Sequence, residues 1–414
     1  MSTCGFNPRS CGHISAYELL SDYAIDISLN AVSAIESLYI HVPFCAHKCE
    51  YCAFYSHAPN GDVVNRYVAA LVREMEMVAG SLKPRTVFFG GGTPSLLNLS
   101  QWEAVFKGME RLGLLGASEW TVECNPATVS LDKAKFLRSW GVNRISMGVQ
   151  SLNETLLERL GRIHTRDMVF RSYDLLRQAG FENVNVDLMF AIPGQTMEIW
   201  KETLQEATAL ETEHLSCYEV IYEEDTPLFH QLQAGEFSLD EDLASEMHEE
   251  LIASAAQAGF RQYEIANFAK DASPGGDFVP SLACQHNLTY WRGGGFHGLG
   301  PSAAEYVNGV RTKNWSNTTL YCEQVERGER PIESRDVLSS LARAGEVAAF
   351  GLRMNSGWDF EQFRDATGFD LEKGWRREIE SLVQRGWGEL GQSRFHLTPN
   401  GLRFADSAAE EFLR

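Results

Sequence analysis

The sequence predicts an α/β protein in which a partial (β/α)6 barrel is followed by a C-terminal helical, winged-helix-like domain. Short apolar runs alternate with longer amphipathic runs from Leu38 to Tyr222, and this alternation is typical of parallel β/α units. Polar motifs follow the apolar runs, at the strand ends where open sheets and barrels bind ligands. From residue 334 the pattern changes to short helices around one hairpin.

The barrel is predicted from six strands and the helices between them. The apolar runs predicted as strands are Leu38–Val42, Thr86–Phe89, Glu119–Glu123, Arg144–Val149, Val184–Phe190 and Leu215–Ile221. The amphipathic runs predicted as helices are Val63–Ala79, Ser100–Arg111, Leu131–Trp140, Thr165–Gln178 and Glu198–Leu210. Since a closed barrel of this type has eight such units, we expect this one to be open on one side.

The same patterns predict further helices and strands between residue 240 and residue 414. Beyond the sixth unit we predict a helix over 240–259, a strand over Arg261–Phe268, a loop over Asp271–Pro280 and a glycine-rich stretch over Arg292–Gly300. For the last domain we predict helices Asp336–Met354, Phe360–Ala366 and Leu371–Arg385, a hairpin over Trp387–Leu397 and a final helix Leu402–Leu413. The predicted parts are an N-terminal extension (1–36), the core barrel (37–270), a connecting region (271–333) and the C-terminal domain (334–414).

Composition and charge exclude several classes of protein. A hydrophobic content of 44% and a charged content of 22% are those of an ordinary globular protein. The formal net charge of −20 argues against general nucleic-acid binding, which needs clustered Lys and Arg. No apolar run is long enough for a transmembrane segment, and the first ten residues lack the pattern of a secretory signal. The nine cysteines do not form a disulfide framework, so we expect a cytoplasmic protein.

Three cysteines follow the first predicted strand at the spacing C-x3-C-x2-C: Cys45, Cys49 and Cys52. Three thiolates can hold three irons of a [4Fe–4S] cluster and leave the fourth iron free for a small ligand. The alternative is a zinc site, for which His47 inside the motif would supply the fourth ligand. The spacing, with an aromatic residue before the last cysteine, resembles that of radical S-adenosylmethionine (SAM) proteins, in which SAM binds the free iron.

The motifs at the later strand ends match a SAM site. Gly91, Gly92 and Thr93 lie in a Gly-Gly-Gly-Thr-Pro turn after the second strand, where glycines let the backbone approach a ligand closely. Four polar residues near the ends of the following strands are expected to point into the same mouth of the barrel. They are Glu123 for the SAM amino group, Asp187 for the ribose hydroxyls, Arg162 for the carboxylate, and Gln150.

Several blocks together resemble the radical SAM coproporphyrinogen dehydrogenase-like family over residues 37–414. The blocks are Leu38-Tyr-Ile-His-Val-Pro-Phe-Cys45, Phe88-Phe-Gly-Gly-Gly-Thr-Pro94, Glu123-x-Asn-Pro126, Ser146-Met-Gly-Val-Gln-Ser151, Asn185-Val-Asp-Leu-Met189, Pro193-Gly-Gln195 and Tyr263-Glu-Ile-Ala-Asn-Phe268. The resemblance implies that Tyr39 and Tyr51 also line the SAM site. The family's Gly-Leu-Pro-Gly-Gln segment begins here with Ala191, a small departure.

Two features separate the branches of this family. The oxygen-independent coproporphyrinogen dehydrogenases carry a fourth cysteine where this chain has Phe54. The other branch, the HemW-type haem chaperones, carries the motif H-N-x-x-Y-W, which is present here and begins at His286. The resemblance therefore implies a haem site in which His286 ligates the iron and Tyr290 and Trp291 stack on the porphyrin.

The resemblance favours a haem chaperone with a [4Fe–4S] cluster, SAM and haem as its cofactors, without dehydrogenase activity. Its implied partners are haem and haem-accepting respiratory proteins, and it would contact membranes only peripherally, through those partners. The first alternative is the anaerobic decarboxylation of coproporphyrinogen III in porphyrin biosynthesis, with SAM cleavage as the source of the radical. The second alternative is an interaction protein that retains the cluster and binds no haem.

Overall fold

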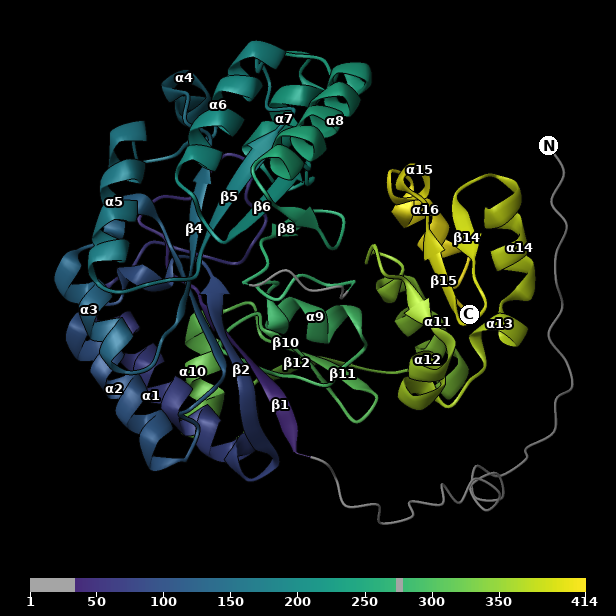
Figure 1. Cartoon of the computed structure of the whole chain (residues 1–414). Helices are drawn as coiled ribbons and strands as arrows, with labels where there is room; N and C mark the ends of the chain where they lie inside the picture. The colour runs from purple at the N-terminus through teal and green to yellow at the C-terminus, as the bar shows by residue number, and fades with distance from the viewer. Residues whose placement is uncertain (1–33, 273–277) are drawn as a thin grey trace, which may run out of the picture. The chain divides into compact units, whose positions relative to one another are not determined.

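The computed structural model describes residues 34–272 and 278–414 (Figure 1). Most of the predicted N-terminal extension, up to residue 33, lies outside these described residues. The described part begins with the first strand of a large sheet, and a separate hydrophobic core underlies the last eighty or so residues. No helix within the described residues is long and apolar enough to cross a membrane.

One mixed sheet of nine strands forms the main domain, and it confirms the predicted α/β partial barrel. The strand order is β7-β8-β6-β5-β4-β3-β2-β1-β9, in which β1 to β6 are parallel and follow one another in sequence order. Its strands are β1 (Ile35–Val42), β2 (Leu82–Gly91), β3 (Glu119–Cys124), β4 (Arg144–Gln150), β5 (Val184–Phe190), β6 (His214–Glu219), β7 (Arg261–Gln262), β8 (Asn267–Ala269) and β9 (His297–Leu299). All six predicted strands are present. β2 begins at Leu82, four residues before the predicted start at Thr86, and the prediction missed these residues because the Lys-Pro-Arg segment is not apolar.

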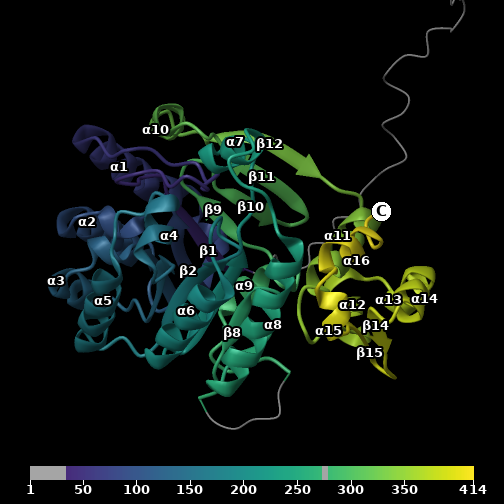
Figure 2. The ribbon, with the colours of Figure 1, turned by 90° about the horizontal axis from the view of Figure 1, so that it is seen from above.

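Helices cover the outer face of this sheet. They are α1 (Gly61–Val78), α2 (Leu99–Arg111), α3 (Leu131–Ser139), α5 (Arg166–Gln178), α6 (Met197–Ala209) and α8 (Glu241–Gln257). Two shorter helices, α4 (Glu154–Arg159) and α7 (Pro227–Gln233), lie at the strand ends and contact the loop after β1. Figure 2 shows α1, α2, α3 and α5 together on one side of β1 and β2, with β10 and β11 on the other. The predicted helices are confirmed, whereas α4 and α7 were not predicted, since each spans less than two helical turns.

The predicted strand Arg261–Phe268 is wrong as a single element. It consists of the two short antiparallel strands β7 and β8, joined by a tight turn, with β8 pairing antiparallel to β6. The turn is closed by the Glu264 carboxylate, which accepts a hydrogen bond from the backbone N–H of Ala266 at 3.0 Å and another from the side chain of Asn267. A buried acidic residue in an apolar run marks this turn.

The connecting region adds structure that the sequence did not predict. It contains α9 (Gln285–Trp291) and α10 (Thr318–Glu326), and an antiparallel sheet of β10 (Ala304–Val307), β11 (Val310–Asn314) and β12 (Ile332–Val337). The predicted glycine-rich stretch ends in β9, which pairs parallel with β1 and extends the main sheet. The predicted domain boundary at residue 334 falls within β12.

The C-terminal domain is helical with a small sheet. Its elements are α11 (Ser340–Gly351), β13 (Trp358–Asp359), α12 (Phe360–Thr367), α13 (Leu371–Gly374), α14 (Arg376–Gln384), β14 (Gly388–Leu390), β15 (Arg394–Leu397), α15 (Pro399–Leu402) and α16 (Ala405–Glu410). The predicted hairpin is present as β14 and β15, and β13 adds a third strand. The predicted helix Asp336–Met354 begins only after β12, and the helix predicted over Leu371–Arg385 is divided into α13 and α14. The helix predicted over Leu402–Leu413 is present as the shorter α16 and is preceded by α15, which ends at Leu402.

Ala191, at the end of β5, adopts a left-handed backbone conformation with φ of 55°. A residue with a Cβ atom is strained there and glycine is not, which gives a physical reason for the glycine that the family carries at this position. We expect Ala191→Gly to raise the free energy of unfolding by about 1 kcal/mol. Urea denaturation would measure this, with Ala127→Gly on an exposed turn as the control; a destabilised Ala191→Gly variant would contradict the interpretation.

Candidate functional site

A cavity of about 630 Å³ opens at the carboxyl ends of the barrel strands. This is the end at which parallel α/β proteins bind ligands, and the volume lies within the range of roughly 300–1,000 Å³ found for small-molecule sites. The structure brings every residue predicted for the cluster and for SAM to this one cavity. They are Tyr39, Cys45, Cys49, Tyr51, Cys52, Gly91, Gly92, Thr93, Glu123, Gln150, Arg162 and Asp187.

The three cysteines lie on one loop that follows β1, and all three are partly exposed to the cavity. The loop is closed at its base, because the Cys45 N–H donates to the carbonyl of His57 at 3.1 Å and the His57 N–H donates to the carbonyl of Pro43 at 2.9 Å. Its middle is attached to the loop after α4, where the Glu50 N–H donates to the carbonyl of Leu160 at 3.1 Å. The backbone of this loop thus holds three thiols at the edge of one cavity, which Cys124 at the end of β3 also lines.

Thr318, at the start of α10, supports this loop from the connecting region. Its hydroxyl lies 2.8 Å from Nε2 of His57, and its backbone N–H donates to the hydroxyl of Tyr55 at 2.8 Å. Sequence reasoning missed this contact, since about 260 residues separate its partners and no local pattern marks Thr318. The connecting region is therefore part of the support for the cysteine loop.

The glycine turn after β2 packs directly against the start of the cysteine loop. The Gly92 N–H donates to the carbonyl of Val42 at 2.8 Å, and the Thr93 N–H donates to the carbonyl of Phe44 at 2.7 Å. A Cβ atom on Gly92 would lie 2.7 Å from both of those carbonyl oxygens, and one on Gly91 would collide with the ring of His41. Glycine is required here because the two backbone segments approach closely. We name the backbone surface that Gly91 and Gly92 form beside the thiols the glycine wall.

Two carboxylates, Glu123 and Asp187, form the polar interior of the cavity. Asp187 accepts a hydrogen bond from the side chain of Asn185 at 2.6 Å, and Glu123 accepts one from the N–H of Gly91 at 3.2 Å. Burial and the nearby charge of Asp187 raise the pKa of Glu123 to about 8. The guanidinium of Arg144 also faces this cavity, and its buried Nε has no protein partner. The two carboxylates can accept hydrogen bonds from the amino and hydroxyl groups of a ligand, and the Nε of Arg144 can donate one.

Gln150 and Arg162 complete the side nearest to the cysteines. Gln150 has a φ of 67° and follows a bulge between β4 and β5, so its side chain turns into the cavity where the strand ends. Arg162 is anchored by a hydrogen bond to the carbonyl of Gly148, and its other terminal nitrogen lies 3.4 Å from Sγ of Cys49. Its Nε is buried without a protein partner. The guanidinium therefore faces the sulfur of Cys49 as well as the space for a ligand carboxylate.

The predicted haem residues lie elsewhere, within α9. Of the motif that begins at His286, the residue that lines the cavity is Asn287. His286 itself is 1% exposed, with Nδ1 at 2.9 Å from the hydroxyl of Thr86 and Nε2 at 2.7 Å from the hydroxyl of Tyr290. Its ring stacks on Phe88 at 5.2 Å, and burial lowers its pKa to about 3. Both nitrogens thus have protein partners, and one of these bonds must open for His286 to bind iron.

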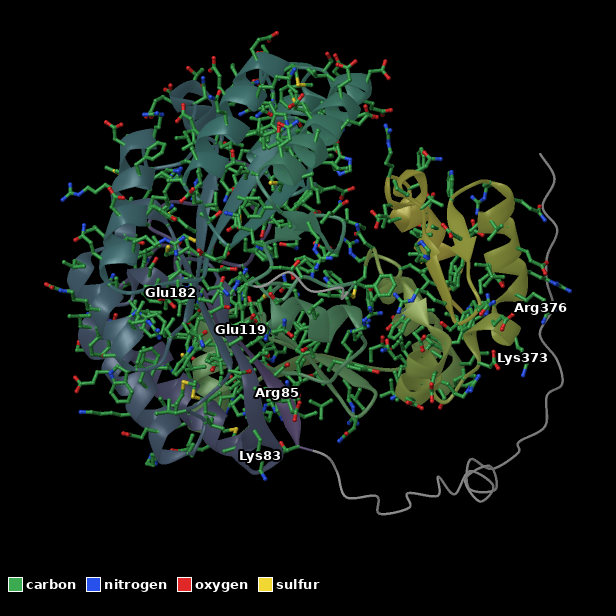
Figure 3. All side chains as sticks on the ribbon, viewed as in Figure 1. Lys83, Arg85, Glu119, Glu182, Lys373 and Arg376 are labelled. Atoms are coloured by element: carbon green, nitrogen blue, oxygen red, sulfur yellow. The ribbon has the colours of Figure 1, made fainter. Side chains whose placement is uncertain are left out.

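Other contacts fix α9 on the inner face of the barrel. The carboxylate of Glu119 (Figure 3) accepts hydrogen bonds from the backbone N–H groups of Gln285 and His286 at 2.8 and 2.9 Å, where the helix begins. Trp291, at the other end, is covered by the guanidinium of Arg353 at 4.9 Å. The motif is placed by contacts at both ends of its helix, and the predicted stacking of Tyr290 and Trp291 on one ligand would require them to leave these partners.

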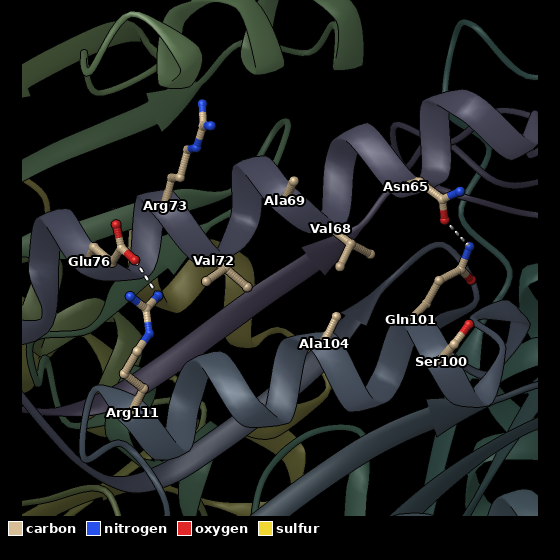
Figure 4. Close-up of a pocket in the computed structure, with 10 residues that line it drawn as sticks. All are labelled: Asn65, Val68, Ala69, Val72, Arg73, Glu76, Ser100, Gln101, Ala104 and Arg111. Atoms are coloured by element: carbon tan, nitrogen blue, oxygen red, sulfur yellow. Dashed lines mark hydrogen bonds and ion pairs between the residues drawn. The ribbon is translucent and has the colours of Figure 1, made fainter.

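A second hollow of about 480 Å³ lies on the outer surface between α1 and α2 (Figure 4). Val68, Val72 and Ala104 form its apolar floor, and Asn65 and Gln101 are joined at one end by a 2.9 Å hydrogen bond. It contains none of the residues predicted for a ligand. The cavity at the strand ends is therefore the candidate site.

Comparisons with known proteins agree with this geometry. Residues 39–207 match the model of the radical SAM superfamily, and residues 338–404 match that of the HemN C-terminal domain. The heme chaperone HemW of Lactococcus lactis is 34% identical over 91% of this chain and 97% of its own length. HemW of Bacillus subtilis is 33% identical over 92% of this chain and 99% of its own length.

A solved structure supports the fold. The coproporphyrinogen III oxidase HemN of Escherichia coli, described as a radical SAM enzyme, superimposes with a TM-score of 0.78. The superposition covers 92% of this chain and 90% of HemN, at 21% sequence identity. At this identity the likeness shows a shared fold and does not decide between the activities of its members.

Proposed function

The chain belongs to the HemW family of radical SAM proteins, and from this premise we propose that it is a haem chaperone that passes haem to haem-accepting respiratory proteins. The observation that carries the proposal is the similarity to HemW chaperones over more than nine-tenths of both chains. Phe54 supports it, since this residue lines the cavity at the position where the dehydrogenase branch has its fourth cysteine. We place the protein in the cytoplasm, with membrane contact only through its acceptors.

In this proposal Cys45, Cys49 and Cys52 hold a [4Fe–4S] cluster. A cluster with three protein ligands keeps one iron free to bind SAM and can supply it with an electron. The glycine wall and Gln150 would position SAM beside that iron, with Glu123 and Asp187 accepting hydrogen bonds from its amino and hydroxyl groups. The family match favours this cluster over the zinc alternative that the cysteine spacing left open.

Haem binding and transfer test the function itself. Haem titrated into the anaerobically reconstituted protein should bind at one equivalent and then move to haem-depleted respiratory membranes, as followed by the Soret absorption. Incubation with coproporphyrinogen III, SAM and a reductant should yield no decarboxylated product. An absence of specific haem binding would overturn the proposal in favour of an interaction protein, and product formation would favour the dehydrogenase.

Arg162 should tune the cluster. A positive charge and an N–H donor 3.4 Å from a ligating sulfur stabilise the reduced, more negative state. We therefore expect Arg162→Gln to lower the reduction potential of the cluster by tens of millivolts, measured by EPR during a redox titration. Arg166→Gln is the charge-matched control, because Arg166 pairs with Glu206 on the outer helices. An unchanged potential in Arg162→Gln would assign Arg162 to SAM alone.

SAM binding should depend on pH through Glu123. With a pKa of about 8, this carboxyl is mostly neutral at pH 7 and becomes an anionic, stronger acceptor above that value. The ratio of wild-type to Glu123→Gln affinity for SAM should therefore grow several-fold from about pH 6.5 to about pH 9. The comparison with Glu123→Gln removes the titration of SAM itself, and equilibrium dialysis at each pH gives both affinities. A ratio that does not vary with pH would exclude this role.

A further inference from the structure

The mouth of the cavity is apolar, unlike its interior. Phe54 and Ile221 are the most exposed large apolar side chains of the described residues, at 68% and 67%, and both line the cavity. Ile163 and Tyr218 line it too and are 45% and 41% exposed. We name these four residues the apolar rim. An exposed apolar cluster of this kind marks a binding surface, because it costs free energy to leave it in water.

The rim comes from loops on different sides of the mouth. Phe54 lies on the cysteine loop after β1, Ile163 on the segment after α4, and Tyr218 and Ile221 at the end of β6. β1 and β6 are the two outer strands of the parallel series, with β4 between them. A ligand that contacts all four side chains must therefore be broad enough to extend across the opening.

SAM does not account for the rim. The interior of the cavity is formed by the groups that fit SAM. These are the side chains of Glu123, Asp187 and Gln150 and the backbone of the glycine wall. The rim residues offer no acceptor or donor besides the hydroxyl of Tyr218. A broad, apolar and planar second ligand matches them better, since aromatic and aliphatic side chains pack well on the face of a large ring.

The mouth carries both signs of charge, because Lys48 and Glu219 line the cavity and are exposed. A ring with acidic substituents would therefore place a carboxylate beside the ammonium group of Lys48, on the side of the cysteine loop. By contrast, His286 is enclosed by Thr86, Phe88 and Tyr290, and its burial leaves no open face for a macrocycle.

We infer that the haem macrocycle binds on the apolar rim, across the mouth of the cavity, and that His286 positions α9 instead of ligating the iron. This inference rests on the proposed haem-chaperone function and assigns the site at which that function takes place. Haem on the rim would cover the space for SAM, and both ligands would share one opening.

Haem titrations of four variants test the placement. Phe54→Ser/Ile221→Ser removes the two most exposed rim residues, and Ile163→Ser/Tyr218→Ser removes the other two. Leu239→Ser/Ile252→Ser is the matched control, because both residues are exposed and lie outside the cavity. His286→Gln tests the competing site, since it keeps a hydrogen-bonding side chain but removes the imidazole.

We expect each rim variant to weaken haem binding by about tenfold or more, with the cluster content unchanged. The control and His286→Gln should bind within about twofold of the wild type. Wild-type binding in both rim variants, loss of binding in His286→Gln, or equal weakening by the control would overturn the placement while the chaperone function stands. A wild type that binds no haem would overturn the function as well, so the two failures are distinguishable.

Discussion

Cys49→Ser is expected to abolish the iron–sulfur cluster and, with it, tight binding of SAM. A serine hydroxyl is a poor iron ligand, and two remaining thiolates cannot hold a cluster that already lacks a fourth protein ligand. Residues that only hydrogen-bond to a metal ligand change affinity by roughly 10–100-fold when they are mutated. Loss of a residue that ligates the iron directly should cost more, so SAM affinity should fall by more than about 100-fold. Iron and sulfide analysis after anaerobic reconstitution, followed by equilibrium dialysis with SAM, measures both losses.

Cys322→Ala is the control, because Cys322 is buried in α10 and does not line the cavity. It should retain the iron, the sulfide and the SAM affinity of the wild type. Zinc analysis of the same samples separates the two interpretations of the motif. A stoichiometric zinc ion in the wild type, lost in Cys49→Ser, would contradict the cluster and restore the zinc site with His47.

The features that could be predicted from the sequence are those with local patterns. The parallel strands are apolar runs buried on both faces, as in Leu38–Val42, and the outer helices repeat their apolar residues at helical spacing. Because parallel strands end at one edge, polar residues after successive strands meet, and the twelve residues predicted for the cluster and SAM indeed line one cavity. The order of the strands along the chain was therefore enough to predict that these residues meet, without knowledge of any contact between distant residues.

The features that could not be predicted depend on contacts between distant residues. β9 is three residues long and exists because it pairs with β1, some 260 positions earlier. Thr318 supports the cysteine loop through Tyr55 and His57, and nothing near it in the sequence marks this role. The H-N-x-x-Y-W motif was found by resemblance, but its burial against Phe88 became visible only in the fold.

Glu74 is a signal in the sequence from which a long-range contact could have been predicted. Glu74 lies within the apolar stripe of α1, between Leu71 and Val78, where a charge is unfavourable unless it is paired. The structure shows its partners, which all come from the connecting region. Its carboxylate accepts hydrogen bonds from the N–H of Gly300 at 2.9 Å, the hydroxyl of Tyr321 at 2.7 Å and the side chain of Asn314 at 2.8 Å, and Arg330 lies 3.6 Å away.

Glu74→Ala is therefore expected to reduce the free energy of unfolding by about 3–5 kcal/mol, the range observed when one partner of a buried charge network is removed. The substitution removes the acceptor of the Gly300 N–H and of the Tyr321 hydroxyl, in a site where Glu74 is 0% exposed. Arg330 and Asn314 each lose one of two partners, since Arg330 also pairs with Glu305 and Asn314 also donates to the carbonyl of Gly300. Urea denaturation followed by circular dichroism measures the loss. Asn314→Ala, which removes one donor and keeps the charge, should cost only about 1–3 kcal/mol and remain measurable if Glu74→Ala does not fold.

Glu76→Ala is the control on the same helix, because the Glu76 side chain is exposed and pairs with Arg111 at the surface. Its cost should stay below about 1 kcal/mol. Since Glu74 joins the connecting region to α1, its loss should also loosen α10 and the cysteine loop that Thr318 supports, so the Glu74→Ala protein should lose its cluster faster in a chelator than the control does. Equal stability and equal cluster loss in the two variants would show that the connecting region is held by its other contacts and that Glu74 is not required.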